Sequence, residues 1–448
     1  MLIVLALAMG MMNISCEKFL EVTPKHAIED ELAIIDKKSA EQALRGVYRA
    51  VGNYQQSYIT VNVLAGGDIT FNNVGDPHLI ISHDFRADNS NIGAAWAGIY
   101  KMINQANLLI DKVPTLTDPQ FTEATKNQLL GEAIFFRALG YFDLVRLWGG
   151  VPLKLTPTVN LNQPVGLQRS TVEQTYAQVE ADLTKASTLL NATGVNRIRA
   201  SKSSVQALWS RLYLYQKKWD LAEQSATLLI GNTNYELIKP FTAWFKGDVG
   251  TKESILEIAY SNQNPNGLRA AFQHQTKGGS YSLAPKVATA TLLNDPAIGG
   301  GTTGRRALVG SITQAGTTVW YGDLYFRNPA SDPIYLQRIA EQYLIRAESR
   351  VYKNNLSGAL SDINEVRSRA NLGALTAANF SVTSAEALLK AIQDERRFEF
   401  LFEGDRWPDL VRTGAAKALF AIEDYKLLLP IPLDEVVIGG IGQNPRYN

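Results

Sequence analysis

The sequence predicts a mainly α-helical protein, in which paired helices form a scaffold and one long segment forms a loop-rich insertion. Three observations support this fold class. Apolar residues recur at helical spacing through most of the first half of the chain. Two pairs of successive helical segments, far apart in the chain, have similar lengths and patterns. Between them, residues 231–333 are rich in Gly, Asn, Thr and Pro and carry no sustained helical period.

The first fifteen residues are predicted to be a lipoprotein signal peptide. Leu2–Met12 is an uninterrupted apolar segment, about half as long as the roughly 20 residues of a membrane-spanning helix. Cys16 follows closely and is the only cysteine, so it cannot form an internal disulfide. Cleavage before Cys16 would let its sulfur and new amino group carry lipid, and more than one acyl chain anchors a protein stably. The alternative is a short apolar helix with an incidental cysteine.

The scaffold is expected to begin within residues 36–230 with four helices. The third is apolar nearly all round, which is typical of a helix buried between neighbours, and it stops at Gly149-Gly150. The fourth opens with Ser170 followed by Glu173, the pattern of a capping box. The four helices are expected over Lys38–Asn53, Ala94–Asp111, Leu129–Leu147 and Ser170–Leu190.

Two further segments each read as a pair of successive helices. Ser201–Ile230 contains one pair, and the second pair spans Tyr335–Tyr352 and Ser357–Ala370. Two-helix units of about 34 residues are typical of tetratricopeptide-like repeats, in which each pair buries its face against the next. We therefore expect the helical repeat scaffold over roughly residues 36–230 and 334–403, within a single domain of residues 16–448.

Residues 231–333 are expected to be a loop-rich insertion, and residues 404–448 a C-terminal segment. A long irregular stretch inside a compact protein is usually functional. Gly299–Gly304 matches GxGxxG, but no strand precedes it and Arg305 replaces the Lys-Ser/Thr pair of a phosphate loop. A flexible loop is the better interpretation.

Composition excludes several classes of function. The chain has 44 Lys and Arg against 43 Asp and Glu, so no net basic field attracts nucleic acid. A hydrophobic content of 46% excludes wholesale disorder.

No metal site and no cofactor are expected, because the histidines form no ligand cluster, and each is expected on the surface or in a loop. They are His26, His78, His83 and His274.

Glu395–Gly414 is the most charged stretch and contains candidate carboxylates for glycoside hydrolysis. Arginines alternate with these carboxylates, and neighbouring guanidinium groups lower carboxyl pKa values, which disfavours a general acid. An ion-paired network that fixes a helix end and its following turn is the favoured interpretation. The carboxylates are Glu399, Glu403, Asp405 and Asp409, and the arginines are Arg396, Arg397, Arg406 and Arg412.

Several stretches together resemble the SusD/RagB family of surface lipoproteins. They occur in the family's order and extend from Cys16 almost to the end of the chain. These stretches are "CEKFLEVTP", "GEAIFFRALGYFDLVRLWGGVPL", "YLIRAESR" with "ALSDINEVRSRAN", "DERRFEFLFEGDRWPDLVR" and "LLLPIPLDEV…QNPRY". Pro408 stands where an aromatic residue is common in the family.

The resemblance implies a helical protein with tetratricopeptide-like pairs as scaffold and irregular loops as ligand surface. It also implies a location on the outer face of the outer membrane, held by lipid. There the protein would capture oligosaccharides, or peptides in some members, and pass them to a SusC-type TonB-dependent transporter. The alternatives are a secreted glycan hydrolase, for which no GxSxG elbow or positioned carboxylate pair is evident, and a protein-interaction scaffold built from the repeats.

Two loop regions offer the aromatic and hydrogen-bonding side chains that a sugar surface needs. One is Ala65–Asn73 and the other is Val319–Phe326, which holds Asp323. Exposure is expected for Trp320 and Tyr321, whereas Trp96 could equally pack in the core. The candidate ligand-binding residues are Asp68, Phe71, Asn72, Trp96, Tyr281, Trp320 and Tyr321.

Overall fold

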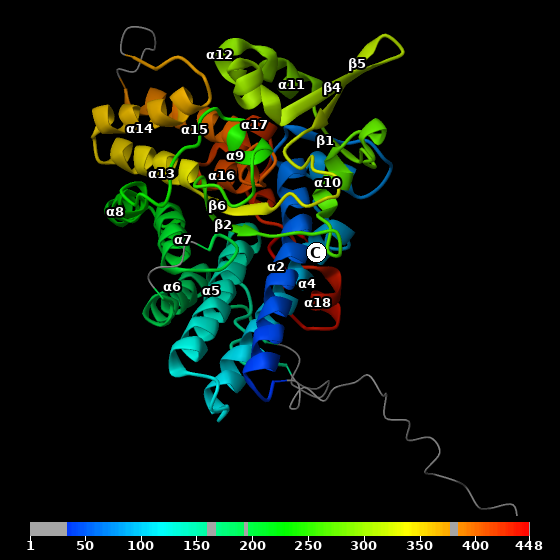
Figure 1. The fold of residues 1–448 in the computed structure, drawn as a ribbon. Coiled ribbons are helices and arrows are strands. Elements are labelled where there is room, and N and C mark those ends of the chain that lie inside the picture. Colours follow the sequence, from blue (N-terminus) through cyan, green and yellow to red (C-terminus); the bar gives the residue numbers. More distant parts are fainter. Residues whose placement is uncertain (1–33, 159–166, 192–195, 377–383, 448) are drawn as a thin grey trace, which may run out of the picture.

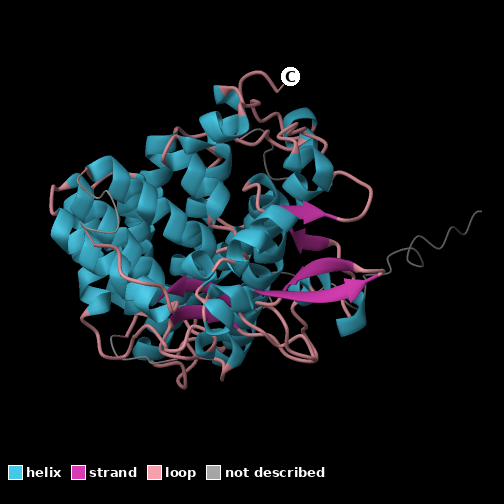
Figure 2. Cartoon of the chain, turned by 90° about the horizontal axis from the view of Figure 1, so that it is seen from above, coloured by secondary structure: helices cyan, strands magenta, loops and turns pink. Residues whose placement is uncertain are grey.

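The computed structural model describes residues 34–158, 167–191, 196–376 and 384–447, and these form a mainly helical body (Figures 1 and 2). The first half is a row of long helices in which α2 packs on α4, and α4 and α6 pack on α5. Its helices are α2 (Lys37–Ala65), α3 (Pro77–Ile81), α4 (Ser90–Lys112), α5 (Glu123–Trp148), α6 (Val172–Leu189), α7 (Lys202–Tyr215) and α8 (Trp219–Ile230).

The second half consists of short helices followed by the second helix pair and its neighbours. The short helices are α9 (Ala243–Lys246), α10 (Gly267–Phe272), α11 (Val287–Asn294) and α12 (Pro296–Gly299). The remainder are α13 (Ile339–Tyr352), α14 (Leu356–Arg369), α15 (Ala385–Glu399), α16 (Arg406–Arg412), α17 (Ala415–Phe420) and α18 (Leu433–Val437).

Helix α5 is buried from Leu129 to Trp148 on nearly every side, as its apolar pattern predicts. Its charged residues are tolerated inside because each has a partner. The Arg137 guanidinium, for example, donates to both carboxylate oxygens of Asp182 on α6, at 2.8 and 2.7 Å. Buried charges persist only when they are paired in this way. The helix ends where Gly149 adopts a φ of 74°, a left-handed conformation that glycine reaches without strain.

The predicted helix pairs are present as α7–α8 and α13–α14, and α8 also packs against α13. Ala222 and Ala359 are fully buried, which lets the paired helices approach closely. Across the second pair, Asp362 of α14 accepts hydrogen bonds from Arg346 and Arg350 of α13. The tetratricopeptide-like scaffold expected from the sequence is confirmed.

Two details of the expected helices are wrong. The residues from Ile334 to Arg338 form a buried strand rather than the start of a helix, because they pair with residues 254–258. Helix α6 is capped by Thr171, not Ser170. The Thr171 hydroxyl accepts from the Gln174 N–H, and the Gln174 side chain bonds back to the Thr171 N–H.

In the described part of the chain, three separate two-stranded antiparallel ribbons accompany the helices. β2 (Ser254–Ile258) pairs with β6 (Ile334–Arg338) deep inside the body, and every residue of both strands is buried. β1 (Ile69–Phe71) pairs with β3 (Leu283–Pro285), and β4 (Val309–Gln314) pairs with β5 (Thr317–Gly322). The segment expected to be loop-rich therefore contains most of the strands in the described residues.

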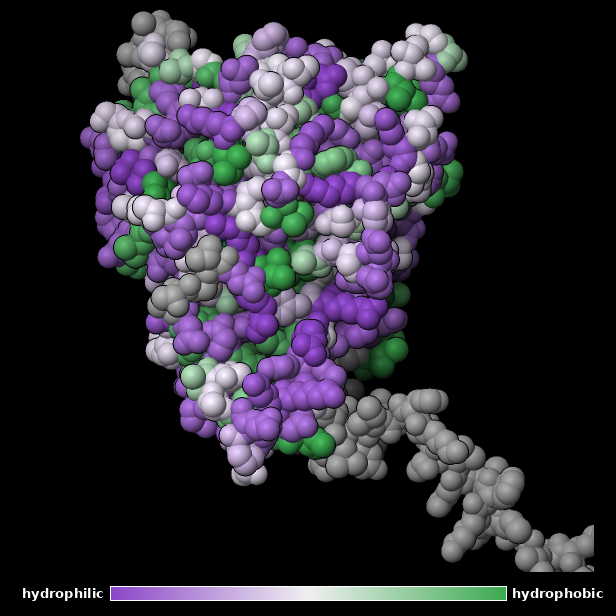
Figure 3. Space-filling view, in the orientation of Figure 1, coloured by the Kyte–Doolittle hydropathy of each residue, from purple (hydrophilic) through white to green (hydrophobic). Residues whose placement is uncertain are grey.

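The visible surface is mostly polar, with hydrophobic residues scattered over it (Figure 3). None of the helices in the described part of the chain has the length and apolar character of a membrane span. The predicted signal peptide and Cys16 lie outside the described residues.

Candidate functional site

The β4–β5 hairpin projects from the helical body at the upper right of Figure 1. Its turn consists of Ala315 and Gly316, whose φ angles of 47° and 78° are both positive. Two central residues with positive φ are typical of tight hairpins, because their twist matches that of the flanking strands. The hairpin therefore holds Trp320 and Tyr321 in fixed positions beside the body.

The β1–β3 ribbon brings the early loop to the same place. The side-chain amide of Asn72 donates to the carbonyl oxygen of Tyr281 at 2.9 Å. The Tyr281 hydroxyl donates in turn to the carbonyl oxygen of Trp320 at 2.8 Å. Segments about two hundred residues apart in the chain are thus joined, since Asn72 and Tyr281 are separated by 209 positions. Five of the predicted residues come together here: Phe71, Asn72, Tyr281, Trp320 and Tyr321.

The rings of this group have different surroundings. The His274 ring lies 4.8 Å from the ring of Tyr281 and 6.4 Å from that of Tyr321, measured between centroids. Trp320 is half-buried, and the guanidinium carbon of Arg306 lies 4.9 Å from its ring centroid. Sequence reasoning did not single out His274 or Arg306 as parts of the site.

A cleft of about 600 Å³ opens beside Tyr321. Its volume falls within the range of small-molecule pockets. Asp323 is fixed on its wall, since Gln273 donates to one carboxylate oxygen at 3.1 Å and Lys246 lies 2.7 Å from the other. Rings, amides and charged groups alternate around the opening: Arg269, Gln273, Thr276, Lys277, Gly278, Tyr321, Asp323, Phe326 and Asn328.

Tyr321 is not exposed as expected, because only 8% of its surface is accessible. Gly310 stands opposite it in the hairpin register. A Cβ atom at Gly310 would lie 2.1 Å from the Tyr321 ring, so the ring lies directly over the glycine backbone. Trp320 was also expected to be exposed, and it is only partly so, since its side chain is half-buried. The glycine on the partner strand is the signal that could have indicated a packed ring.

Asp68 and Trp96 lie in the interior, so neither stands on the surface where a ligand would meet it, and for Trp96 the core alternative is the correct one. Asp68 is 2% exposed and binds the guanidinium groups of Arg397 and Arg406. Trp96 is 1% exposed, and its ring lies 5.3 Å from that of Trp148. Its helical spacing with buried neighbours on α4 places it on the core face of that helix.

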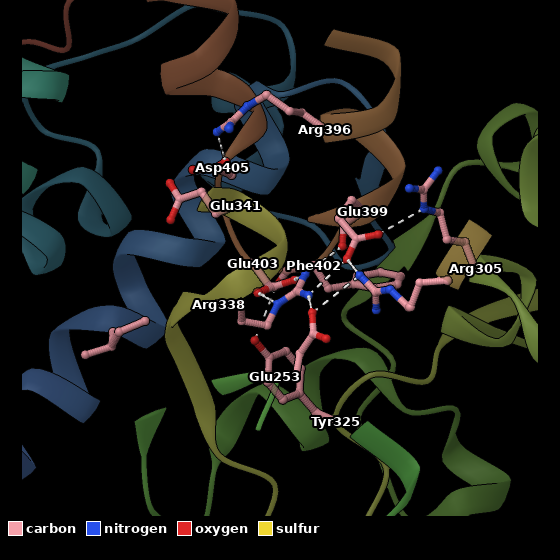
Figure 4. A network of polar contacts seen from close by, with 12 residues as sticks. Glu253, Arg305, Tyr325, Arg338, Glu341, Arg396, Glu399, Phe402, Glu403 and Asp405 are labelled. Atoms are coloured by element: carbon pink, nitrogen blue, oxygen red, sulfur yellow. Dashed lines mark hydrogen bonds and ion pairs between the residues drawn. The ribbon is translucent and has the colours of Figure 1, made fainter. Parts of the chain in front are cut away.

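The charged segment around α15 and α16 forms an ion-paired network, as predicted (Figure 4). Glu399 is fully buried and contacts Arg305 at 3.1 Å, Arg338 at 2.9 Å and also Arg369. Burial alone would raise the pKa of Glu399, but the three arginines outweigh it and lower the pKa to about 2. This carboxylate is held as an anion and serves as a structural ion-pair partner.

Glu403 contradicts the expectation that all these carboxyl pKa values are lowered. Burial raises the pKa of Glu403 to about 7, although Arg338 opposes the shift. Arg338 donates to both of its oxygens, at 2.9 and 2.7 Å. A raised pKa suits a general acid, but Glu403 borders a cavity of only about 40 Å³, which is too small for a sugar ring, and Arg338 binds both of its oxygens.

No group of three histidines, cysteines or acidic residues that could hold a metal occurs among the described residues. The expectation that each histidine lies on the surface or in a loop is correct for the three that the structure describes: His78 is exposed, and His83 and His274 lie in loops, although both are buried. His83 is 4% exposed and bonds to the carbonyl of Ala65 at 2.9 Å. His274 is 5% exposed beside Tyr281. His26 lies outside the described residues.

Comparison with known proteins identifies relatives over most of the chain. Residues 18–214 match a family model described as starch-binding associating with outer membrane, and residues 323–446 match the model of the SusD family. SusD-like protein P38 of Formosa agariphila is 25% identical over 92% of this chain and 90% of its own length.

Solved structures give the same result. A SusD superfamily protein from Bacteroides thetaiotaomicron superposes with a TM-score of 0.77 at 25% identity, covering 91% of this chain and 99% of the other. A laminarin-binding SusD-like protein superposes with a TM-score of 0.77 at 23% identity, covering 92% of this chain and all of the other. From its ordered motifs, its helix pairs and these matches, we conclude that the chain belongs to the SusD/RagB family.

Proposed function

We propose that this chain is a lipid-anchored protein that captures oligosaccharides at the outer face of the outer membrane. The observation that carries the proposal is the surface at the β4–β5 hairpin. Sugars present flat apolar faces edged by hydroxyl groups, and this surface places the half-buried ring of Trp320 near the exposed amide of Asn72. The adjoining cleft adds Asp323, Gln273 and Asn328, which can fix the orientation of a ligand.

The relatives support a glycan as the ligand. One solved relative binds laminarin, and the family model that matches the first part of the chain is described as starch-binding. The ion pairing of the buried carboxylates supports a binding protein that does not cleave its ligand. Glu399 is held ionised, and both Glu399 and Glu403 are committed to Arg338.

The anchor and the partner complete the proposal. Cys16 follows a segment with the pattern of a lipoprotein signal, and its lipid would hold the chain at the membrane. The bound oligosaccharide would then pass to a SusC-type TonB-dependent transporter. Membership of the family supports both steps.

Isothermal titration of the mature chain with laminari-oligosaccharides, malto-oligosaccharides and mixed oligopeptides tests the ligand class. We expect saturable binding of one glycan series, with the oligosaccharides recovered intact by chromatography. Binding of the peptides alone would overturn the glycan assignment, and the appearance of shorter sugars would indicate a hydrolase.

Coexpression with the TonB-dependent transporter encoded nearest to its gene tests the partner. Joint elution from size exclusion is expected, and separate elution would contradict it.

A further inference from the structure

A second cleft, of about 450 Å³, lies between α15 and the α16–α17 segment. It shares no lining residue with the cleft beside Tyr321. Its lining combines the cationic side chains of Lys390, Arg396, Arg397 and Arg406 with the apolar side chains of Leu410, Ala418 and Leu419. Its volume is that of a small-molecule pocket, and its lining offers both charged and apolar groups.

Two of the guanidinium groups share a single carboxylate. Arg397 donates to Asp68 through Nη2 at 2.5 Å and through Nε at 3.0 Å. The Nε of Arg406 lies 2.8 Å from the same carboxylate. Thr289 also donates to Asp68, at 2.9 Å, so this anion is already saturated. Burial lowers the pKa of Arg406, although the negative charge of Asp68 acts to raise it. The negative charge near Arg406 is therefore too small to offset the burial of its guanidinium group.

Arg396 also lines the cleft, and it carries one buried donor without a partner in the described part of the chain. Its side chain is 3% exposed, its Nε donates to Asp409 at 2.7 Å, and its Nη2 donates to Asp405. Its Nη1 is buried and has no hydrogen-bond partner among the described residues. A buried donor without a partner is costly, so the charge of Arg396 is not fully compensated within the protein.

The acidic residues of the cleft are already engaged. Asp409 is bound by Arg396 and by Arg412, and Asp405 by Arg396. Asp394 at the rim pairs with Lys390 at 2.7 Å. The acidic side chains of the lining are therefore already paired within the protein, and the remaining charged groups that line the cleft are Arg397 and Arg406, which share Asp68.

We propose that this cleft binds an oxyanion carried on a small saccharide. The oxyanion would be either the carboxylate of a uronic acid or a sulfate ester. Guanidinium groups bind oxyanions through paired hydrogen bonds, and the apolar side chains of Leu410, Ala418 and Leu419 suit the flat face of a sugar ring. The inference does not depend on glycan binding at the hairpin. The cleft would serve as an acidic-sugar subsite in its own right.

Isothermal titration of the mature chain with methyl glucuronoside, methyl glucoside and sodium sulfate tests this site. We expect the glucuronoside to bind and the neutral glucoside, which differs only at the carboxylate, not to bind detectably at millimolar concentration. Weaker binding of sulfate than of the glucuronoside would support a sugar ligand. Equal binding of sulfate would assign the site to a free anion and overturn the saccharide. Absence of binding by both anions would overturn the site itself.

Two variants at one exposed position locate the binding. Ala418 lies on the surface of α17 and lines the cleft, so its replacement should leave the core undisturbed. Ala418→Glu places a carboxylate opposite the arginines and should weaken glucuronoside binding at least tenfold. Ala418→Gln has the same size without the charge and should bind within a factor of three of the wild type. Equal affinities for the Glu and Gln variants would show that the anion binds elsewhere.

Discussion

Glu399 and Glu403 lie four residues apart and both contact Arg338, yet their pKa values are shifted in opposite directions (Figure 4). The pKa of Glu399 is about 2, because three arginines outweigh the effect of burial. The pKa of Glu403 is about 7, because burial outweighs the effect of Arg338. At pH 5.5 the folded protein should therefore hold Glu399 ionised and Glu403 mostly protonated. Glu399→Gln and Glu403→Gln form a matched pair at this pH.

The cost of each change follows from its charge state. Lowering a carboxyl pKa from 4.5 to about 2 favours the ionised form by about 3 kcal/mol. Glu399→Gln removes that charge and leaves Arg305, Arg338 and Arg369 with too few carboxylates, and breaking a buried ion pair typically costs about 3–5 kcal/mol. Glu403→Gln replaces a neutral carboxyl by a neutral amide, so we expect a cost of about 1 kcal/mol, equivalent to one hydrogen bond.

Equilibrium unfolding in urea at pH 5.5, followed by tryptophan fluorescence, measures both costs. The difference between the two variants should be at least about 2 kcal/mol, with Glu399→Gln the less stable. Equal destabilisation, or a larger effect of Glu403→Gln, would refute the assignment of charge within the network.

Three further predictions concern the anchor, the core and the pH dependence of stability. Cys16→Ala should move the protein from the membrane fraction to the soluble fraction with its circular dichroism spectrum unchanged; unchanged fractionation would contradict lipidation. Trp96→Ala should lower the free energy of unfolding by about 3–5 kcal/mol, because it removes a buried ring from the core, and a change within 1 kcal/mol would contradict its interior position. For Glu403, the folded pKa of about 7 exceeds the value of 4.5 for an unperturbed carboxyl, so its contribution to stability is full below pH 4.5 and lost as pH rises to 7. Urea unfolding between pH 5 and pH 8 should therefore show a decline in stability that is smaller in Glu403→Gln, and an identical decline would contradict the raised pKa.

Local periodicity predicted the helices that dominate the fold. The apolar pattern of α5 indicates burial on all sides without reference to any other segment, and the paired helices follow from small residues such as Ala222 and Ala359. The strand at Ile334–Arg338 was missed, because a short apolar run does not distinguish a strand from a helix. Its identity depends on pairing with β2, about eighty residues earlier in the chain.

The β4–β5 hairpin was missed for a different reason. Ala315 occupies a turn position with positive φ, where asparagine or glycine would have been the usual signal. Alternating residues on either side of Ala315-Gly316 were the remaining indication of two strands. The regular structure of the hairpin is what fixes the position of Trp320.

The two regions that the sequence singled out meet in the structure, but the sequence did not indicate which of their side chains face outward. The hydrogen bond between the Asn72 side chain and the Tyr281 carbonyl joins these two regions. Asp68 is buried because Arg397, more than three hundred residues later, folds over it. Trp96 is buried because Trp148 packs against it. Such long-range partners are not evident from local spacing.

The affinity of the Trp320→Ala variant for the best oligosaccharide of the titration panel tests the central claim most directly. Trp219→Ala is the matched control, because Trp219 is also half-buried and stacks on Tyr352 in another part of the molecule, at 4.0 Å between centroids. Trp320→Ala should weaken binding at least tenfold, about 1.4 kcal/mol, while its melting temperature falls no further than that of Trp219→Ala. Unchanged affinity in Trp320→Ala together with a large drop in melting temperature would show that Trp320 serves the core and that sugars bind elsewhere.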